Sequence, residues 1–147
     1  MQIRHASAGD SRRLAELHVL SRYDMAYLPY VHPFVSVERW MRDVVIPRQR
    51  VWVAEVDRTA VGYASFHEGF LTNLYVHPSH QCQGIGAALL SEVRAHATAG
   101  LQLWVFEANR AAIRFYERYG ARTVQRTDGS QNEEGLPDRL VCLDARE

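Results

Sequence analysis

Residues 70–90, which read FLTNLYVHPSHQCQGIGAALL, contain a strand, a glycine-bearing turn and the start of a helix in direct succession. The apolar run at 71–76 predicts a strand, and the His77-Pro78 pair ends it. Beyond the turn, apolar residues recur at helical spacing at Ile85, Leu89, Leu90 and Val93. The first N–H groups of a helix lack partners and carry partial positive charge. Because Gly84 and Gly86 have no side chains, a diphosphate can approach these groups closely, and the stretch predicts a site for one.

The spacing of the glycines separates the common phosphate motifs. A dinucleotide site needs G-x-G-x-x-G, and Leu89 stands where the third glycine belongs. A nucleoside triphosphatase loop needs Gly-Lys-Ser/Thr, a triplet that the chain lacks. The pattern Gln81-x-x-Gly84-x-Gly86 resembles the acetyl-CoA loop of the GNAT family of acyl-CoA-dependent N-acyltransferases. The alternative is a strand-to-helix turn whose glycines only ease the bend.

A second block, residues 101–120 with the sequence LQLWVFEANRAAIRFYERYG, favours the family interpretation. It predicts a strand at 101–106, a helix that starts at Asn109, and an end at Gly120. The inward face of that helix comprises Ala112, Phe115, Tyr116 and Tyr119. In the GNAT family the corresponding strand, asparagine, helix and Phe-Tyr pair complete the CoA site. Both blocks occur in the family's order and spacing, so the chain is identified as a member, closely over 70–120 and loosely elsewhere.

The composition is that of an ordinary globular protein, since 47% of the 147 residues are hydrophobic and 23% are charged. This length suits one N-acetyltransferase domain over residues 1–147. Lys+Arg and Asp+Glu both number 17, so the charge balance favours neither nucleic acid nor a membrane surface as a partner. We expect no signal peptide and no membrane span, because no apolar run is long enough. Two cysteines without paired spacing predict no metal site, and they fit a reducing cytoplasm.

Patterns elsewhere in the chain predict the remaining elements. Strands are expected at 3–5, 51–56, 60–67, 121–128 and 136–143, and helices at 9–19 and 37–45. The passages 70–106 and 101–128 each read strand-helix-strand, which predicts parallel neighbours, whereas the hairpin at 51–67 predicts antiparallel ones. The fold class is therefore α/β (α+β), a mixed sheet with helices on both faces. The resemblance implies the GNAT fold, with about seven strands and a splay between strands four and five, at 70–77 and 101–106, that admits the pantetheine arm.

The resemblance implies acetyl-CoA as co-substrate, without a metal, and direct attack by an amine within a ternary complex. The diphosphate is expected on backbone N–H groups of the loop that Gln81 opens, at Cys82, Gln83, Gly84, Ile85, Gly86 and Ala87. The strand backbone at Leu74, Tyr75 and Val76 is expected to hold the pantetheine arm. Asn109 resembles the family's asparagine that helps to hold this arm, although a plain helix cap explains it equally well.

Acetyl transfer requires a proton for the leaving thiolate and a base for the amine. Tyr116 is the predicted general acid, because an ordinary phenol, with a pKa of about 10, keeps its proton at neutral pH. The alternative is that Tyr116 only packs in its helix stripe. Some relatives place a glutamate on the second parallel strand as base, but Trp104 stands at that position here. Glu68, with His67, is the remaining candidate, through a water relay, although a surface role competes.

In the GNAT family the first helices and the last hairpin loop frame the acceptor, which the resemblance implies to be a small-molecule or peptide amine. Tyr27 and Tyr30 belong to an aromatic cluster suited to such a pocket, although core filling also explains them. Glu133 and Glu134 lie in the loop TDGSQNEEGLPD and are expected to attract a cationic amine, the alternative being a merely solvated loop. Family habit suggests a homodimer.

Two classes of function fit these observations. The first is an acetyl-CoA-dependent N-acetyltransferase, which Tyr116 favours. The second is a non-catalytic acyl-CoA-binding sensor or regulatory domain of the same fold, which Trp104 at the base position favours. A dinucleotide-binding module is disfavoured by Leu89. No motif in the sequence specifies the acceptor amine or the length of the acyl chain.

Overall fold

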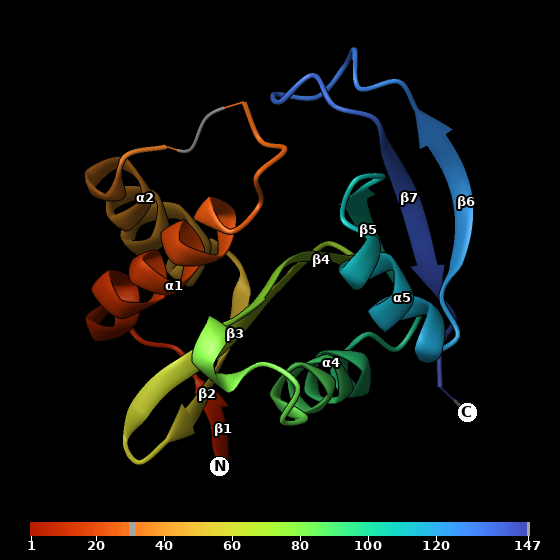
Figure 1. The fold of residues 1–147 in the computed structure, drawn as a ribbon. Coiled ribbons are helices and arrows are strands. Elements are labelled where there is room, and N and C mark those ends of the chain that lie inside the picture. The colour runs from red at the N-terminus through yellow and green to blue at the C-terminus, as the bar shows by residue number, and fades with distance from the viewer. Residues whose placement is uncertain (30–31, 147) are drawn as a thin grey trace.

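The computed structural model describes residues 1–29 and 32–146, and its centre is a seven-stranded sheet (Figure 1). The strand order is β1-β2-β3-β4-β5-β7-β6. The strands are β1 (Gln2–His5), β2 (Arg50–Val56), β3 (Thr59–His67), β4 (Phe70–Val76), β5 (Leu101–Phe106), β6 (Arg122–Thr127) and β7 (Asp138–Leu143). Each lies within two residues of a strand that the sequence pattern predicts.

Helices cover both faces of the sheet, as the pattern predicts. On one face lie α1 (Ser11–Tyr23) and a helical segment composed of α2 (Phe34–Trp40), a π-helical turn (Met41–Val45) and α3 (Ile46–Arg48). On the other face lie α4 (Ile85–His96) and α5 (Arg110–Arg118) (Figure 1). The predicted first helix ends four residues early, because the polar SRY sequence that completes α1 has no apolar periodicity of its own. No helix in the described ranges is long and apolar enough to cross a membrane.

Strand β2 separates two apolar cores, because its side chains alternate between the two faces. Val51 and Val53 pack with Leu14 and Leu17 of α1. Trp52, on the opposite face, packs with α4. The stripe that the sequence predicts on α4 is buried in this second core at Ile85, Leu89, Leu90 and Val93. Helix α4 is thereby fixed against the sheet, and the turn before it lies beyond the C-terminal end of β4.

Strands β4 and β5 are parallel, as predicted, but they barely pair. A single register pair joins them, Phe70 with Gln102, next to a hydrogen bond from the Gln102 N–H to the Gly69 carbonyl at 2.9 Å. By contrast, β4 pairs with β3 along its whole length. The two parallel strands therefore part after their first residues, in agreement with the splay that the resemblance implies.

The expectation that β5 and β6 are parallel neighbours was wrong. Strand β7 lies between them and pairs antiparallel with both, so β5 and β6 run in the same direction without touching. The residues explain this order. The apolar side chains of Val141 and Leu143 are buried in the core from the central position, whereas the polar sequence RTVQRT of β6 is almost wholly exposed at the edge.

Candidate active site

The turn before α4 presents a row of backbone N–H donors at residues 82–87, the donor row. Gly84 adopts a φ of +82° at the N-cap, and Cys82 has a φ of +62°. The first hydrogen bond of the helix runs from the Ala88 N–H to the Gly84 carbonyl at 3.0 Å. Within the described ranges, no acceptor contacts the backbone N–H of any residue from 82 to 87. Because the helix end also carries partial positive charge, this row fits a diphosphate, as the sequence predicts.

Two glutamine side chains hold this turn against β4. Gln81 donates from Nε2 to the Val76 carbonyl at 3.1 Å, and Gln83 donates from Nε2 to the Ser79 carbonyl at 3.4 Å. Both glutamines are otherwise exposed. Gly86 faces α5, where an added Cβ would lie 3.5 Å from the Phe115 ring. The donor row is therefore fixed to the end of β4 and packed beside α5.

The backbone of β4 is open toward β5 next to this turn. The His77 N–H donates to the Val61 carbonyl at 2.7 Å, and Tyr75 lies opposite Tyr63 in the β3–β4 register. Since antiparallel strands alternate their bonding direction, the Tyr75 N–H and C=O also face β3. The backbone groups of Leu74 and Val76 consequently face the gap between β4 and β5. The predicted contacts to a pantetheine arm are available at the Leu74 backbone and the Val76 N–H rather than at Tyr75, since the Val76 carbonyl accepts from Gln81.

Helix α5 brings Tyr116 to the same side of the sheet as the donor row. Its N-cap Asn109 accepts a hydrogen bond on Oδ1 from the Ala112 N–H at 3.2 Å, which is the capping role that the sequence allows. Tyr116 is 7% exposed, and Phe115 contacts it edge-on with ring centroids 5.1 Å apart. Burial, with a smaller contribution from Tyr75, raises the pKa of Tyr116 well above that of a free phenol. The side chain thus keeps its proton at any physiological pH.

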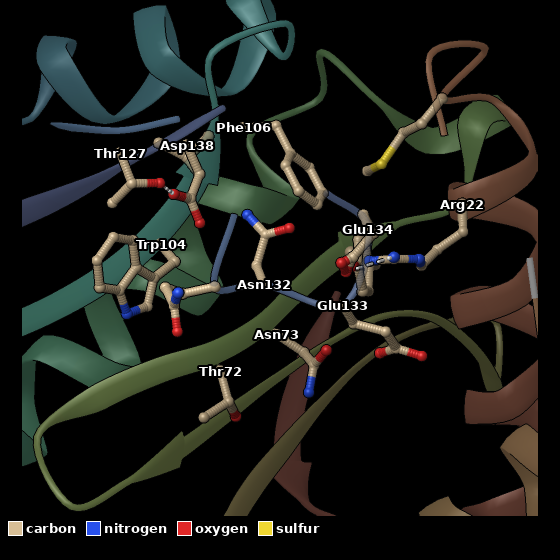
Figure 2. Close-up of a pocket in the computed structure, with 14 residues that line it drawn as sticks. Arg22, Thr72, Asn73, Trp104, Phe106, Thr127, Asn132, Glu133, Glu134 and Asp138 are labelled. Atoms are coloured by element: carbon tan, nitrogen blue, oxygen red, sulfur yellow. Dashed lines mark hydrogen bonds and ion pairs between the residues drawn. The ribbon is translucent and has the colours of Figure 1, made fainter. Parts of the chain in front are cut away.

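A cavity of about 520 Å³ opens between β4 and β5 on the α1 face of the sheet (Figure 2). Polar and charged side chains dominate its wall. It is lined from β4 by Thr72, Asn73 and Tyr75, from β5 by Trp104, Val105 and Phe106, from α1 and the residues after it by Arg22 and Met25, and from the β6–β7 region by Thr127, Gln131, Asn132, Glu133, Glu134 and Asp138. The donor row and α5 lie on the opposite face, so the gap between β4 and β5 joins two separate surfaces.

Charges of both signs surround the cavity. Glu134 lies 3.6 Å from Arg22 across the space between the β6–β7 loop and α1, and both side chains are largely buried. Burial lowers the pKa of Arg22, but Tyr75 and the two neighbouring glutamates outweigh burial and leave that pKa raised. Glu133 contacts His32 at 2.6 Å on the more exposed rim. The cavity is therefore a charged, semi-enclosed site that suits a polar acceptor.

Comparison with known proteins identifies this arrangement. The acetyltransferase (GNAT) domain family matches residues 47–120, half of the chain. The peptidyl-lysine N-acetyltransferase YiaC of Escherichia coli (strain K12) is 34% identical over 117 residues, which is 75% of this chain and 78% of YiaC. The chain belongs to the GNAT acetyltransferase family. It is an acyltransferase that depends on acetyl-CoA.

Solved GNAT structures share the whole fold. The structure of yncA from Salmonella typhimurium, which holds acetyl-CoA, superposes with a TM-score of 0.79 at 22% identity and covers 100% of this chain and 95% of yncA. NAA60 of Arabidopsis thaliana, in complex with a bisubstrate analogue, has a TM-score of 0.72 at 19% identity, with 97% of each chain covered. At these identities the likeness shows the fold, and the roles of individual residues rest on the geometry of this GNAT chain.

The predicted acceptor residues of this GNAT chain differ in where they lie relative to the cavity. Glu133 and Glu134 line the cavity. Tyr27 contacts Phe106 with ring centroids 5.9 Å apart, and its hydroxyl is buried without a hydrogen-bond partner among the described residues. Tyr30 lies outside the described residues. Tyr27 of the predicted aromatic cluster therefore lies against the cavity wall.

The predicted base Glu68 does not reach the cavity. It lies in the β3–β4 turn with a φ of +49°, at the end where β4 and β5 are still paired. Its side chain is 82% exposed and forms an ion pair with His67 at 3.6 Å. Trp104, at the position where some relatives have a glutamate, lines the cavity with 46% of its surface exposed. Neither of the two positions supplies a carboxylate to the site.

Most cavity residues were absent from the predicted site, among them Arg22, Asn73 and Asp138. Arg22 reads in sequence as a surface residue of α1, and only the tertiary fold brings it over β4. Asn73 is a polar residue inside a strand, buried to 8% exposure, and its Nδ2 donates to Ser65 Oγ at 2.8 Å. Asp138 opens β7, where strand alternation places it on the face of Leu140 and Cys142. The polar residues inside apolar strands were the signal that could have found Asn73 and Asp138.

Proposed function

We propose that the protein transfers the acetyl group of acetyl-CoA to a primary amine that enters the cavity on the α1 face. The observation that carries this proposal is the single β4–β5 register pair, beyond which the strand backbone is open between the donor row and the cavity. A thioester threaded through this gap from the donor row would meet an amine from the other side. The backbone at Leu74 and Val76 would hold the arm and polarise the carbonyl.

Tyr116 is proposed as the acid that protonates the departing thiolate. It lies in α5 and contacts the ring of Phe115, which in turn packs beside Gly86 of the donor row. Burial holds its pKa high, so the phenol keeps its proton at neutral pH and has one to donate to a thiolate that forms next to it. Asn109 is occupied as the cap of α5 through Oδ1, and its Nδ2 remains the group that the pantetheine arm would meet.

The proposed acceptor is a cationic amine, and a lysine side chain of a polypeptide is the first candidate. Glu133 stands at the rim, where its carboxylate attracts an incoming ammonium group, while Glu134 is held by Arg22. Trp104 offers a large exposed ring to the aliphatic stem of such a side chain. YiaC, a relative at 34% identity, is named as a peptidyl-lysine N-acetyltransferase, which supports the same class of acceptor.

Thiol release from acetyl-CoA across a panel of amines tests this proposal. The panel should contain Nα-acetyl-lysine amide, a peptide with a free N-terminus and a diamine, with mass spectrometry to identify the acetylated product. We expect turnover with Nα-acetyl-lysine amide and a fall of about 10²-fold in kcat for Tyr116→Phe, the typical value of one acid catalyst. Binding of acetyl-CoA without release for any amine would instead support the sensor function.

We also propose that residues 1–147 form a single N-acetyltransferase domain and that the protein is a homodimer. A reducing cytoplasmic location and the absence of nucleic acid as a partner are proposed as well. The free thiols of Cys82 and Cys142 are compatible with a reducing compartment. Cross-linking and size-exclusion chromatography with light scattering test the oligomeric state directly.

A further inference from the structure

Strand β7 places the carboxylate of Asp138 in the cavity wall. Neither the sequence motif nor the family match assigns a role to this residue. Asp138 lies directly opposite Phe106 in the β5–β7 register, and Trp104 lies opposite Leu140 two residues along. Because side chains alternate along a strand, these four side chains share one face of the sheet. Val141 and Leu143 occupy the other face, in the core beneath α4 and α5. Asp138 therefore points to the acceptor side of the gap (Figure 2).

The surroundings of Asp138 hold the carboxylate in place and leave one oxygen available. Thr127 donates its hydroxyl to Asp138 Oδ1, and the same Thr127 Oγ1 accepts a hydrogen bond from the Gly129 N–H at 3.1 Å. Asp138 is 8% exposed. Its Oδ2 has no hydrogen-bond donor among the described residues and is not sealed in the interior, so it opens into the cavity. A fixed, accessible oxygen of this kind can accept a proton.

The other carboxylates of the cavity wall are already engaged. Glu134 is paired with Arg22, and Glu133 is paired with His32 at the rim. Among the described cavity residues, Asp138 alone carries a carboxylate without a basic partner. We propose that Asp138 is the general base that removes the proton from the acceptor amine, directly or through one water. It would replace the glutamate that some relatives have on β5, where this chain has Trp104. This inference rests on the proposed function.

The incoming ammonium group first loses one proton to solvent. The lone pair of the resulting neutral amine forms the new N–C bond to the thioester carbon, and the C–S bond breaks with its electron pair on sulfur. The surplus proton on nitrogen passes to Asp138 Oδ2, and the thiolate takes the phenolic proton of Tyr116. Solvent then returns the proton from Asp138 to Tyr116, so the enzyme is restored and the products are the amide and free CoA. Base and acid lie on opposite faces of the sheet, where Asp138 accepts the proton from nitrogen and Tyr116 donates a proton to sulfur.

Asp138→Asn tests the assignment with Nα-acetyl-lysine amide as the acceptor. We expect kcat to fall by about 10²-fold or more, with the acetyl-CoA KM and the thermal stabilisation by acetyl-CoA unchanged. Since hydroxide can replace a missing base, the deficit should shrink as the pH rises. Formate, a small carboxylate, should partly restore the activity of Asp138→Ala. A purely structural role for Asp138 predicts neither the pH effect nor the rescue.

Asp128→Asn is the matched control, because Asp128 lies at the other end of the same loop and is bonded only to Ser130 locally. Its kcat should stay within about twofold of the wild-type value, as for surface substitutions generally. Wild-type kcat and an unchanged pH profile in Asp138→Asn would overturn the assignment, as would a loss of activity confined to Glu68→Gln. Inactivity of the wild-type protein toward every amine would refute the proposed function instead, which keeps the two failures distinguishable.

Discussion

His18 shows at the scale of one residue how the α1 face is built around neutral groups. Its ring contacts Trp40 and Tyr75 with centroids 5.2 and 5.0 Å away, and its Nδ1 lies 2.8 Å from the Tyr63 hydroxyl. Burial, assisted by the charge of Arg22, lowers the pKa of His18 to about 3. A cation at this position would have no compensating partner, so the folded protein holds the imidazole uncharged.

This pKa shift makes stability depend on pH in a defined direction. The unfolded chain has an ordinary histidine pKa of about 6.5, so the stabilising contribution is complete above that pH. As the pH falls below about 6.5, His18 binds a proton in the unfolded state but not in the folded state. The free energy of unfolding should therefore drop by up to about 1.4 kcal/mol per pH unit between about pH 6 and pH 4.

Urea titrations of the wild type and of His18→Gln at several pH values measure this effect. Glutamine can keep a hydrogen bond to Tyr63 but cannot be protonated, so its pH slope should be smaller. The carboxylates titrate alike in both proteins, and they cancel in the difference. Parallel stability curves for the two proteins between pH 6 and pH 4 would contradict a buried neutral His18.

At the scale of elements, the β6–β7 loop is an ordered cover for the cavity. Asn132 donates from Nδ2 to the Leu136 carbonyl at 2.7 Å and accepts on Oδ1 from the N–H groups of Gly135 and Leu136 at 2.7 and 3.2 Å. Gly129, with a φ of +86°, packs so closely that an added Cβ would lie 2.3 Å from the Leu136 carbonyl carbon. These contacts hold Glu133 and Glu134 over the site before any acceptor arrives.

Asn132→Ala should loosen this loop and affect the acceptor side alone. Each lost hydrogen bond contributes about 1 kcal/mol. Their loss suffices to lower the ratio of the ordered to the loosened loop about tenfold or more. We expect the KM for Nα-acetyl-lysine amide to rise accordingly, while the Kd for acetyl-CoA stays unchanged. Ser130→Ala, in the same exposed loop, is the control. An equal loss of acetyl-CoA affinity in Asn132→Ala would show that the loop has another role.

The elements also show what the sequence could and could not predict. Every strand and the cap at Asn109 followed from local signals, because alternation, turn residues and capping are properties of neighbouring residues. The insertion of β7 between β5 and β6 did not, since strand order depends on which strand gains two hydrogen-bonded neighbours. The glycine spacing at Gly84 and Gly86 pointed to the donor row. Arg22 could not be assigned, because only the assembled fold brings it over β4 to the cavity.

At the scale of the whole molecule, one sheet separates two ligand surfaces and opens between them. The donor row and Tyr116 lie on the α4–α5 face, and the charged cavity lies on the α1 face. Where β4 and β5 part, both surfaces meet the same strand backbone. A thioester and an amine can therefore approach from opposite sides without competing for space, which is the geometry that direct transfer requires.

We propose that the backbone N–H groups at 82–87 bind the diphosphate of acetyl-CoA. Calorimetric titration of the purified protein with acetyl-CoA and with S-acetylpantetheine, which lacks the diphosphate, tests this proposal. We expect a one-to-one acetyl-CoA complex with a Kd between about 1 μM and 1 mM, a range typical of enzyme substrates. S-acetylpantetheine should bind at least about tenfold more weakly, a difference of about 1.4 kcal/mol. Undetectable binding of acetyl-CoA, or equal affinity for the two thioesters, would contradict the proposal.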